Sequence, residues 1–356
     1  MSKIKTRNFL QLSWQAMLSD YVTVIAWTPD DTRVAVCSTA GEVVLCQADN
    51  GDAITLQPAH DQSMNTLSIS HDGHFLASAG QSGTVLIWQI NGDFPQIIAK
   101  LTYSSQWIDR LQWNPSHPEL AFSAGRYVYV WDALSQTLVT TLNFVDSSVL
   151  DLLWGLQGEY LAVSGNQSIK IWHRQNWHDD PAILETASAS VAIAWSPEGN
   201  YLASGNNDRS LLVWEWNNPY PWRMQGFPGK VRQLAWSTPV TPDDPPILAS
   251  VSADGIVIWR KVADPSMGWS AQVLAQHHDT VTAIAFQPNS HLLASASKDG
   301  WIYLWHQANQ ISQRLQGASN GFSALSWNGE GTALATAGQQ GELLVWKQSM
   351  RGKGFG

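Results

Sequence analysis

The chain has 356 residues, of which 44% are hydrophobic and only 14% are charged, and its formal net charge is −9 at pH 7. This composition provides enough apolar surface for a full core and excludes a wholly disordered or collagen-like chain. The acidic balance argues against a general nucleic-acid binder, because such proteins present basic surfaces to the phosphate backbone. Two cysteines, Cys37 and Cys46, are too few for a disulfide scaffold or a four-cysteine zinc site.

No apolar run approaches the roughly 20 residues that a membrane-spanning helix needs. The N-terminal residues carry positive charges without an apolar stretch behind them, so no secretory signal peptide is expected. We therefore predict a soluble, cytoplasmic protein without a transmembrane segment. One domain is predicted over residues 1–349, followed by a short, basic and disordered tail over residues 350–356.

Tryptophan is unusually frequent, with 20 residues, and thirteen of these fall on two series. Successive members of the second series are 41 to 46 residues apart, which indicates eight repeats. Each repeat has one position in each series, and Ile69, Phe286 and Cys46 occupy the three positions without tryptophan. The first series is Trp27, Ile69, Trp113, Trp154, Trp195, Trp236, Phe286 and Trp327, and the second is Cys46, Trp88, Trp131, Trp172, Trp214, Trp259, Trp305 and Trp346.

The first predicted element is a strand over residues 9–14, and a second strand over residues 21–27 follows it. Farther along, alternating apolar residues such as Val191, Ile193 and Trp195 indicate further strands, with turns containing Pro or Gly between them. This pattern predicts an all-β protein. The seventh repeat shows four strands, over residues 272–276, 281–286, 291–295 and 301–305.

The seventh repeat also carries a family resemblance. His277-His278-Asp279 precedes its first inner strand, Leu293 to Gly300 read Leu-Ala-Ser-Ala-Ser-Lys-Asp-Gly, and Trp301 to Trp305 form its last inner strand. With a period near 40 to 45 residues, this segment resembles the WD40 family. The Trp-Asp dipeptide itself occurs in these repeats once, as Trp131-Asp132. The resemblance covers residues 9–348 and implies a β-propeller with one blade per repeat.

The resemblance implies a structural tetrad of hydrogen-bonded side chains in a blade. Only the seventh repeat provides all four residue types at matching positions. These residues are His278, Ser295, Asp299 and Trp305.

Ring closure is predicted from the two ends of the chain. The eighth repeat ends at its third strand, residues 342–346, and residues 9–14 provide a spare outer strand. Pairing of these two segments would close an eight-bladed ring and protect the sheet edges. A seven-bladed ring with one repeat misassigned is the alternative.

The sequence contains no phosphate-binding loop, no Gly-x-Ser-x-Gly motif and no Cys-x-x-Cys motif. We expect no catalytic residues, no cofactor and no metal site. His173 and His178 lie near Asp179 and Asp180, but a solvated loop is the favoured interpretation of this segment. Buried thiols are expected for the two cysteines, with a disulfide as the alternative.

The WD40 resemblance implies that partner segments bind the top face, where the chain enters the innermost strands. Trp107 lies outside both tryptophan series, and three cations of this face favour an acidic partner. A solvated rim, with Trp107 folded onto its own blade, is the alternative. The candidate residues are Tyr21, Trp107, Asp109, Lys230, Arg232 and Lys298.

A second candidate surface lies on the opposite face. Trp177, Trp222 and Trp269 also fall outside the two series, and the sixth repeat has an enlarged loop over residues 237–246. These aromatic residues form a possible partner site. The alternative is that they only clamp long loops.

The predicted function is that of a non-catalytic scaffold or assembly adaptor, monomeric, which docks peptide or loop segments of one or more proteins. One alternative is an enzyme with a site at the central channel mouth. Another is recruitment to an anionic surface or nucleic acid through basic termini, although no specific nucleic acid is expected. The terminal basic residues are Lys3, Lys5, Arg7, Lys347, Arg351 and Lys353.

Overall fold

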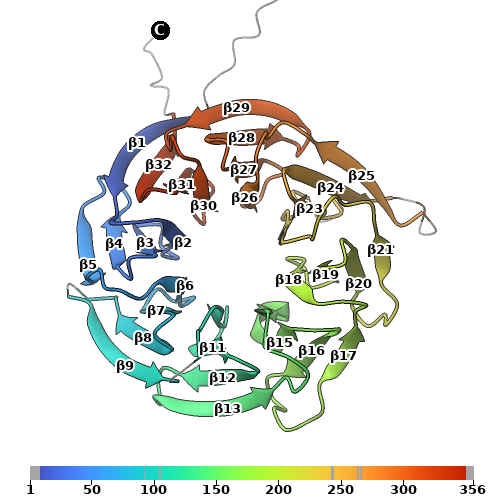
Figure 1. Cartoon of the computed structure of the whole chain (residues 1–356), viewed down its shortest axis with the longest axis horizontal. Coiled ribbons are helices and arrows are strands. Elements are labelled where there is room, and N and C mark those ends of the chain that lie inside the picture. Colours follow the sequence, from blue (N-terminus) through green and yellow to red (C-terminus); the bar gives the residue numbers. More distant parts are fainter. Residues whose placement is uncertain are drawn as a thin grey trace, which may run out of the picture.

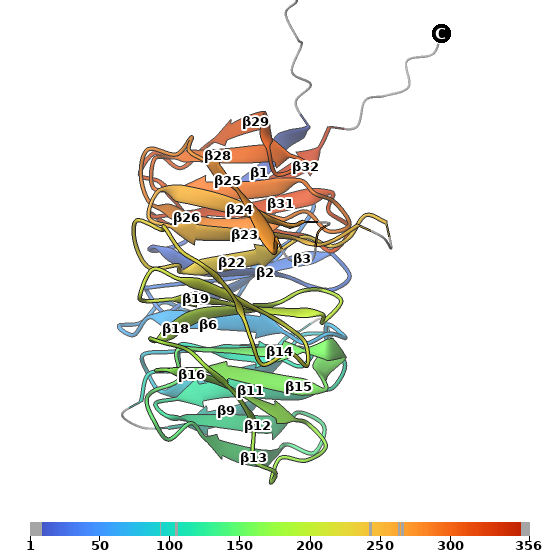
Figure 2. The same cartoon turned by 90° about the vertical axis from the view of Figure 1, so that its right-hand side faces the viewer.

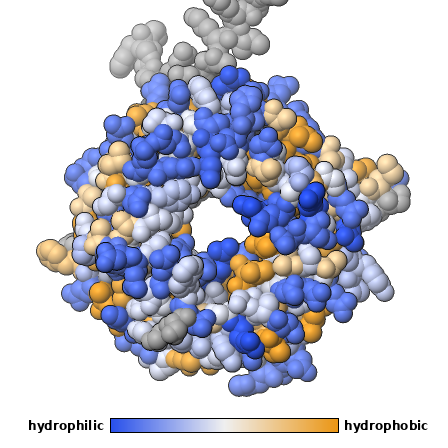
Figure 3. Space-filling view, in the orientation of Figure 1, coloured by the Kyte–Doolittle hydropathy of each residue, from blue (hydrophilic) through white to orange (hydrophobic). Residues whose placement is uncertain are grey.

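The computed structural model describes residues 9–349 except 93, 104–105, 242–243, 263 and 265–266. In this part of the chain, eight four-stranded antiparallel sheets form a ring (Figure 1). The eight-bladed β-propeller predicted from the sequence is therefore confirmed. The ring is open at its centre, and hydrophilic residues dominate much of the face around the opening (Figure 3).

We number the blades in chain order, and each blade has four strands from the centre outward. The innermost strands are β2 (Val22–Trp27), β6 (Met64–Ile69), β10 (Leu111–Trp113), β14 (Asp151–Gly155), β18 (Ser190–Trp195), β22 (Gln233–Trp236), β26 (Val281–Phe286) and β30 (Phe322–Trp327). The second strands are β3 (Arg33–Ser38), β7 (Phe75–Gly80), β11 (Glu119–Ala124), β15 (Tyr160–Ser164), β19 (Tyr201–Asn206), β23 (Ile247–Ser252), β27 (Leu293–Ser297) and β31 (Ala333–Gly338).

The third strands are β4 (Val43–Gln47), β8 (Thr84–Gln89), β12 (Tyr127–Asp132), β16 (Ser168–His173), β20 (Leu211–Glu215), β24 (Gly255–Lys261), β28 (Trp301–His306) and β32 (Glu342–Gln348). The outer strands of blades 1 to 7 are β5 (Ala53–Gln57), β9 (Gln96–Thr102), β13 (Thr137–Asn143), β17 (Ala182–Glu185), β21 (Trp222–Met224), β25 (Trp269–Leu274) and β29 (Gln310–Gln316). The outer strand of blade 8 is β1 (Leu10–Met17). One 3-10 turn, η1 (Leu156–Gly158), is the only helical element among the residues described.

The core lies between neighbouring blades, because each sheet is covered on both faces. Every residue of β7 and β31 is buried, and these strands are rich in alanine and other small residues. Small side chains on the second strands let adjacent sheets approach, and buried rings such as Trp88 and Trp131 fill the space between the sheets. This arrangement explains why the strands carry apolar residues on both faces.

The first tryptophan series joins each blade to the one before it. The indole Nε1–H groups of four members donate to backbone carbonyls of the preceding innermost strand, as between Trp27 and Ser326 at 2.9 Å and Trp236 and Ala194 at 3.0 Å. The Trp195 indole instead lies over Gly155, where an added Cβ would come within 2.2 Å of its Nε1. These contacts explain why a large aromatic residue recurs at the end of the innermost strand.

Three tryptophans of the second series, Trp259, Trp305 and Trp346, form hydrogen bonds within their own blade. The indole of Trp259 donates to Ser250 Oγ at 2.9 Å, and that of Trp346 donates to Thr336 Oγ1 at 3.0 Å. Each bond links the third strand to the second strand, so these residues hold their own sheet together.

Strand β1 closes the ring by pairing with β32, with Leu10 opposite Gln348 and Met17 opposite Glu342. The predicted pairing of the two chain ends is thus confirmed, and the observed strand is longer than the predicted one. Gln313 on β29 fixes β1 from the other side. Its Oε1 accepts from the backbone N–H groups of Phe9 and Leu10, each at 2.8 Å, and its Nε2 donates to Leu10 O at 2.7 Å.

The strands run across the thickness of the ring, so that turns and loops gather on two faces (Figure 2). The top face carries the loops that enter the innermost strands, together with the turns between second and third strands. Hydrogen bonds join these two sets, as from Thr39 N to Tyr21 O at 2.9 Å and from Lys298 N to Thr280 O at 3.0 Å. The bottom face carries the remaining turns.

Both cysteines are free and buried. Burial raises the pKa of Cys37 to about 12 and that of Cys46 to about 11, so neither thiol ionises near neutral pH. We expect no reaction with iodoacetamide in the native protein at about pH 8, because the thiolate is the nucleophile. Mass spectrometry should find both thiols modified only after denaturation in guanidinium chloride. Labelling of the native protein would contradict this burial.

Candidate functional site

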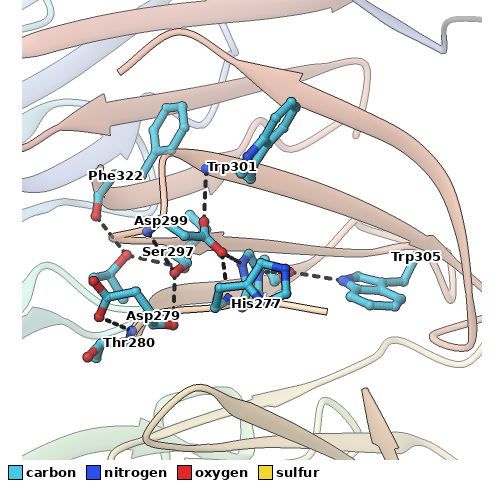
Figure 4. A network of polar contacts seen from close by, with 12 residues as sticks. His277, Asp279, Thr280, Ser297, Asp299, Trp301, Trp305 and Phe322 are labelled. Carbon is cyan, nitrogen blue, oxygen red and sulfur yellow. Dashed lines mark hydrogen bonds and ion pairs between the residues drawn. The ribbon is translucent and has the colours of Figure 1, made fainter. Parts of the chain in front are cut away.

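The tetrad of blade 7 is a continuous chain of buried hydrogen bonds (Figure 4). Trp305 Nε1 donates to Ser295 Oγ at 2.9 Å, and Ser295 Oγ lies 2.8 Å from His277 Nε2. His277 Nδ1 lies 2.9 Å from Asp299 Oδ2. The network therefore runs from the third strand through the second strand to the loop that enters β26.

The histidine of the tetrad is His277, so the prediction of His278 was wrong. The His277 side chain is completely buried, whereas His278 is exposed. His278 still contributes through its backbone, whose N–H donates to Asp299 Oδ2 at 3.0 Å. Two adjacent histidines fit the sequence pattern equally well, and only the course of the loop decides which ring enters the blade.

The donors and acceptors of the network define its protonation state. Ser295 receives the Trp305 N–H and can donate its own proton to His277 Nε2, which leaves the proton of a neutral imidazole on Nδ1, facing Asp299. Burial lowers the pKa of His277, although Asp299 opposes this effect. Every group of the tetrad is thus used internally, which makes it a structural device.

A family model described as WD domain, G-beta repeat, matches residues 51–89, 182–215 and 268–306. The third match contains the tetrad, and each match falls within the eight-bladed ring. The chain is a WD40-repeat β-propeller. Three repeats match the family model, and the remaining blades retain the same strand order with weaker sequence signatures.

Three relatives are similar to this chain over different shares of their own length. Telomerase protein component 1 of Rattus norvegicus is 23% identical over 224 residues, which cover 61% of this chain and 8% of that protein. The B-type cell cycle switch protein ccs52A of Medicago truncatula is 23% identical over 297 residues, covering 80% of this chain and 60% of that protein. Protein transport protein SEC13 of Mycosarcoma maydis is 22% identical over 347 residues, covering 83% of this chain and 92% of that protein.

The predicted top-face residues lie on blades 1, 3, 6 and 7 of the propeller. Trp107 is 61% exposed, so it does not fold onto its own blade. Lys230, Arg232 and Lys298 are exposed, and none of them forms an ion pair within the described residues. Tyr21 is half-buried.

Asp109 has a partner that sequence reasoning did not identify. Asn65 Nδ2 of blade 2 donates to Asp109 Oδ1 of blade 3 at 2.7 Å. The six predicted residues are therefore distributed around the opening and do not form one cluster. Any ligand that contacts all of them would have to extend across the ring.

The innermost strands use their polar side chains to bind the next blade. Thr23 Oγ1 donates to Met64 O at 2.7 Å, and Asp151 Oδ2 accepts from Ile193 N at 3.0 Å. Asp151 also pairs with Arg110 Nε at 3.0 Å. Burial raises the pKa of Asp151, and Arg110 and the backbone N–H groups oppose this effect. These channel residues are thus engaged in contacts between blades, which supports a rigid frame.

Two of the three bottom-face tryptophans share one cluster. Trp222 and Trp269 flank Lys261, whose Nζ lies 5.2 Å and 5.5 Å from their ring centroids. Lys261 also forms an ion pair with Glu215. The rings therefore enclose a cation of the same chain, a role that no repeat signature revealed.

Trp177 lies elsewhere, edge-on to Trp154 with their ring centroids 5.9 Å apart. The three bottom-face residues consequently do not form one continuous site. Residues 242–243 of the enlarged loop lie outside the described residues.

A metal site has no candidate among the residues that the structure describes, because no three His, Cys, Asp or Glu side chains converge. His173 packs edge-on against Tyr160 at 4.8 Å between ring centroids. The described part of the chain also has no helix that is long and apolar enough to cross a membrane.

The predicted basic cluster of the termini falls mostly outside the described residues. Lys347 is the exception, and its Nζ pairs with Asp49 Oδ1 at 2.7 Å. The tail predicted over residues 350–356 also lies outside the described part of the chain.

Proposed function

We propose that this WD40 propeller is a non-catalytic scaffold whose top face docks an acidic peptide or loop segment of a partner protein. The observation that carries this proposal is the set of exposed cations Lys230, Arg232 and Lys298, which have no carboxylate partner within the described residues. Unpaired surface cations attract an acidic segment and raise its association rate.

The rigidity of the frame supports the same function. The backbone of the top face is fixed by hydrogen bonds between loops and turns, and the innermost strands are tied together across blades. A preformed surface avoids much of the ordering cost that opposes binding. WD40 propellers typically act as interaction scaffolds, and the names of the relatives include a cell cycle switch protein and a protein transport protein.

A charge reversal tests the proposal. We expect the Lys230→Glu/Arg232→Glu double variant to capture less than about a fifth of the partner protein that the wild type captures, because repulsion replaces attraction at the docking face. The measurement is quantitative mass spectrometry of proteins that the immobilised full chain captures from a cell extract. Lys100→Glu, an exposed cation on β9, is the matched control. An unchanged set of captured proteins in the double variant would refute top-face docking of an acidic segment.

A further inference from the structure

Three apolar side chains of blade 3 and its flanking loops are exposed on the top face. Trp107 precedes β10 and is 61% exposed, Tyr127 begins β12 and is 39% exposed, and Val145 follows β13 and is 56% exposed. We call these three residues the blade 3 patch. Exposed aromatic side chains are among the residue types that contribute most to protein binding.

A backbone hydrogen bond and a close contact hold the three segments together. The backbone N–H of Phe144 donates to Arg126 O at 2.9 Å, which brings the loop after β13 to the start of β12. Gly125 has a φ of +60°, and an added Cβ there would lie 2.6 Å from Gln106 Oε1. The segments next to Trp107, Tyr127 and Val145 thus meet at the turn between β11 and β12.

Val145 has an unfavourable backbone conformation. Its φ is +72°, and it is the only β-branched residue with a positive φ among those described. The two γ carbons of valine make this region costly, whereas asparagine and glycine tolerate it. Strained residues of this kind persist when the surrounding structure fixes them, and they cluster at functional sites.

Lys170 of β16 fixes the two residues that flank Val145. Its Nζ donates to Phe144 O at 2.6 Å and to Asp146 Oδ2 at 2.9 Å, and it lies 4.8 Å from the centroid of the Phe144 ring. The Lys170 side chain is only 11% exposed, so its ammonium group depends on these partners. Asn143 Oδ1 accepts from Val145 N at 2.9 Å. We call the contacts of Lys170 with Phe144 and Asp146 the Lys170 clamp. This clamp holds the loop in place while the valine side chain faces solvent.

The charges around the patch favour an anionic group. Arg126 is exposed and has no ion-pair partner within the described residues. The neighbouring cations Arg110 and Lys170 are already paired with Asp151 and Asp146. Asp109 is the acidic residue near Trp107, and it accepts a hydrogen bond from Asn65. Arg126 is thus the cation available to a ligand at the patch.

We propose that the blade 3 patch is the anchor of the docking surface. It binds an apolar side chain of the partner segment, and Arg126 binds a carboxylate next to that side chain. This inference rests on the proposed function for the identity of the partner as a protein segment. It adds the place where that segment is fixed and the residue pair that is recognised, an acidic residue beside a large apolar one.

The strain at Val145 gives a test that needs no partner. We expect Val145→Asn to raise the thermal midpoint by roughly 1–2 °C, because asparagine accepts a positive φ. Val139→Asn is the matched control, since Val139 is 41% exposed within the regular strand β13. It should leave the midpoint unchanged or lower it. A lower midpoint for Val145→Asn would overturn the claim that the clamp maintains strain.

A pair of labelled peptides tests recognition by the full chain. The probes are fluorescein-labelled Glu-Asp-Leu-Phe-Glu-Asp and its counterpart Lys-Lys-Leu-Phe-Lys-Lys, measured by fluorescence polarisation. We expect the acidic peptide to bind at least about fivefold more tightly. Val145→Asn and Trp107→Ser should each weaken its binding about fivefold or more, and Arg126→Ala should remove the preference for acid.

The outcomes separate the two proposals. Binding of the acidic peptide that is insensitive to Val145→Asn and Trp107→Ser, but lost in Lys230→Glu, overturns the anchor and leaves top-face docking intact. Failure of the acidic peptide to bind at all also overturns the anchor. The capture experiment with the Lys230→Glu/Arg232→Glu variant then decides the proposed function independently.

Discussion

A chain that lacks residues 9–17 is expected to be strongly destabilised, with a thermal midpoint lowered by roughly 10 °C or more. These residues contain β1, which supplies the outer strand of blade 8. Its removal leaves the hydrogen-bonding edge of β32 unpaired and uncovers the cluster in which Leu10 is buried. It also removes the bond from Trp14 Nε1 to Ala48 O, 2.8 Å long, which joins β1 to blade 1.

The measurement is thermal unfolding followed by circular dichroism, with a chain lacking only residues 1–8 as the control. An unchanged midpoint after removal of residues 9–17 would show that closure by β1 is dispensable. Gln313→Leu provides a finer version of the same test, because it leaves the N–H groups of Phe9 and Leu10 and the Leu10 carbonyl without their partner. Its expected cost is about 2–4 kcal/mol. Gln316→Leu, at an exposed position of the same strand, should change the stability by less than about 0.5 kcal/mol.

The ring could be predicted from the sequence because its repeated contacts use a repeated residue type. Each tryptophan of the first series meets the preceding blade, and each of the second series meets its own second strand, as Trp236 and Trp259 show. The same chemistry therefore had to recur at nearly the same spacing. Counting outer strands then gave eight blades and the closing pair of β1 and β32.

The details that distinguish one blade from another could not be predicted in this way. The choice between His277 and His278 depends on the course of one loop, which the repeat pattern does not determine. Lys261 fills the space between Trp222 and Trp269, although the pattern offered the two rings as an exposed site.

Of the blade 3 patch, the sequence predicted only Trp107, for a related reason. Valine is among the residues least expected at a positive φ, so nothing in the local sequence indicates the conformation of Val145. The Lys170 clamp that fixes this conformation acts between residues of two blades. A contact that occurs only once produces no repeated pattern in the sequence.

His277→Ala is expected to reduce the free energy of unfolding by about 3 kcal/mol, whereas His278→Ala should change it by less than about 0.5 kcal/mol. Loss of the His277 ring removes one hydrogen-bond partner from each of Ser295 and Asp299 and opens a cavity beside Tyr303, whose ring centroid lies 4.7 Å away. The exposed His278 ring makes no comparable contact, and the alanine variant keeps the backbone N–H that donates to Asp299. Denaturant unfolding of both variants compares the two rings directly, and equal losses would contradict the assignment of His277 to the tetrad.

The pH dependence of stability provides the second half of this test. Burial lowers the pKa of His277, so the folded protein holds a neutral imidazole while the unfolded chain takes up a proton near the ordinary pKa of about 6.5. Because stability rises with pH wherever the unfolded state binds more protons, the contribution of His277 is complete above about pH 6.5 and decreases as the pH falls below that value. Burial opposes ionisation of Asp299, but hydrogen bonds from His278 N, His277 and Trp301 N keep its pKa low, which adds a further loss below about pH 4. The wild type should therefore lose stability between about pH 7 and pH 5 more steeply than His277→Ala, and parallel profiles would mean that this histidine does not titrate on unfolding.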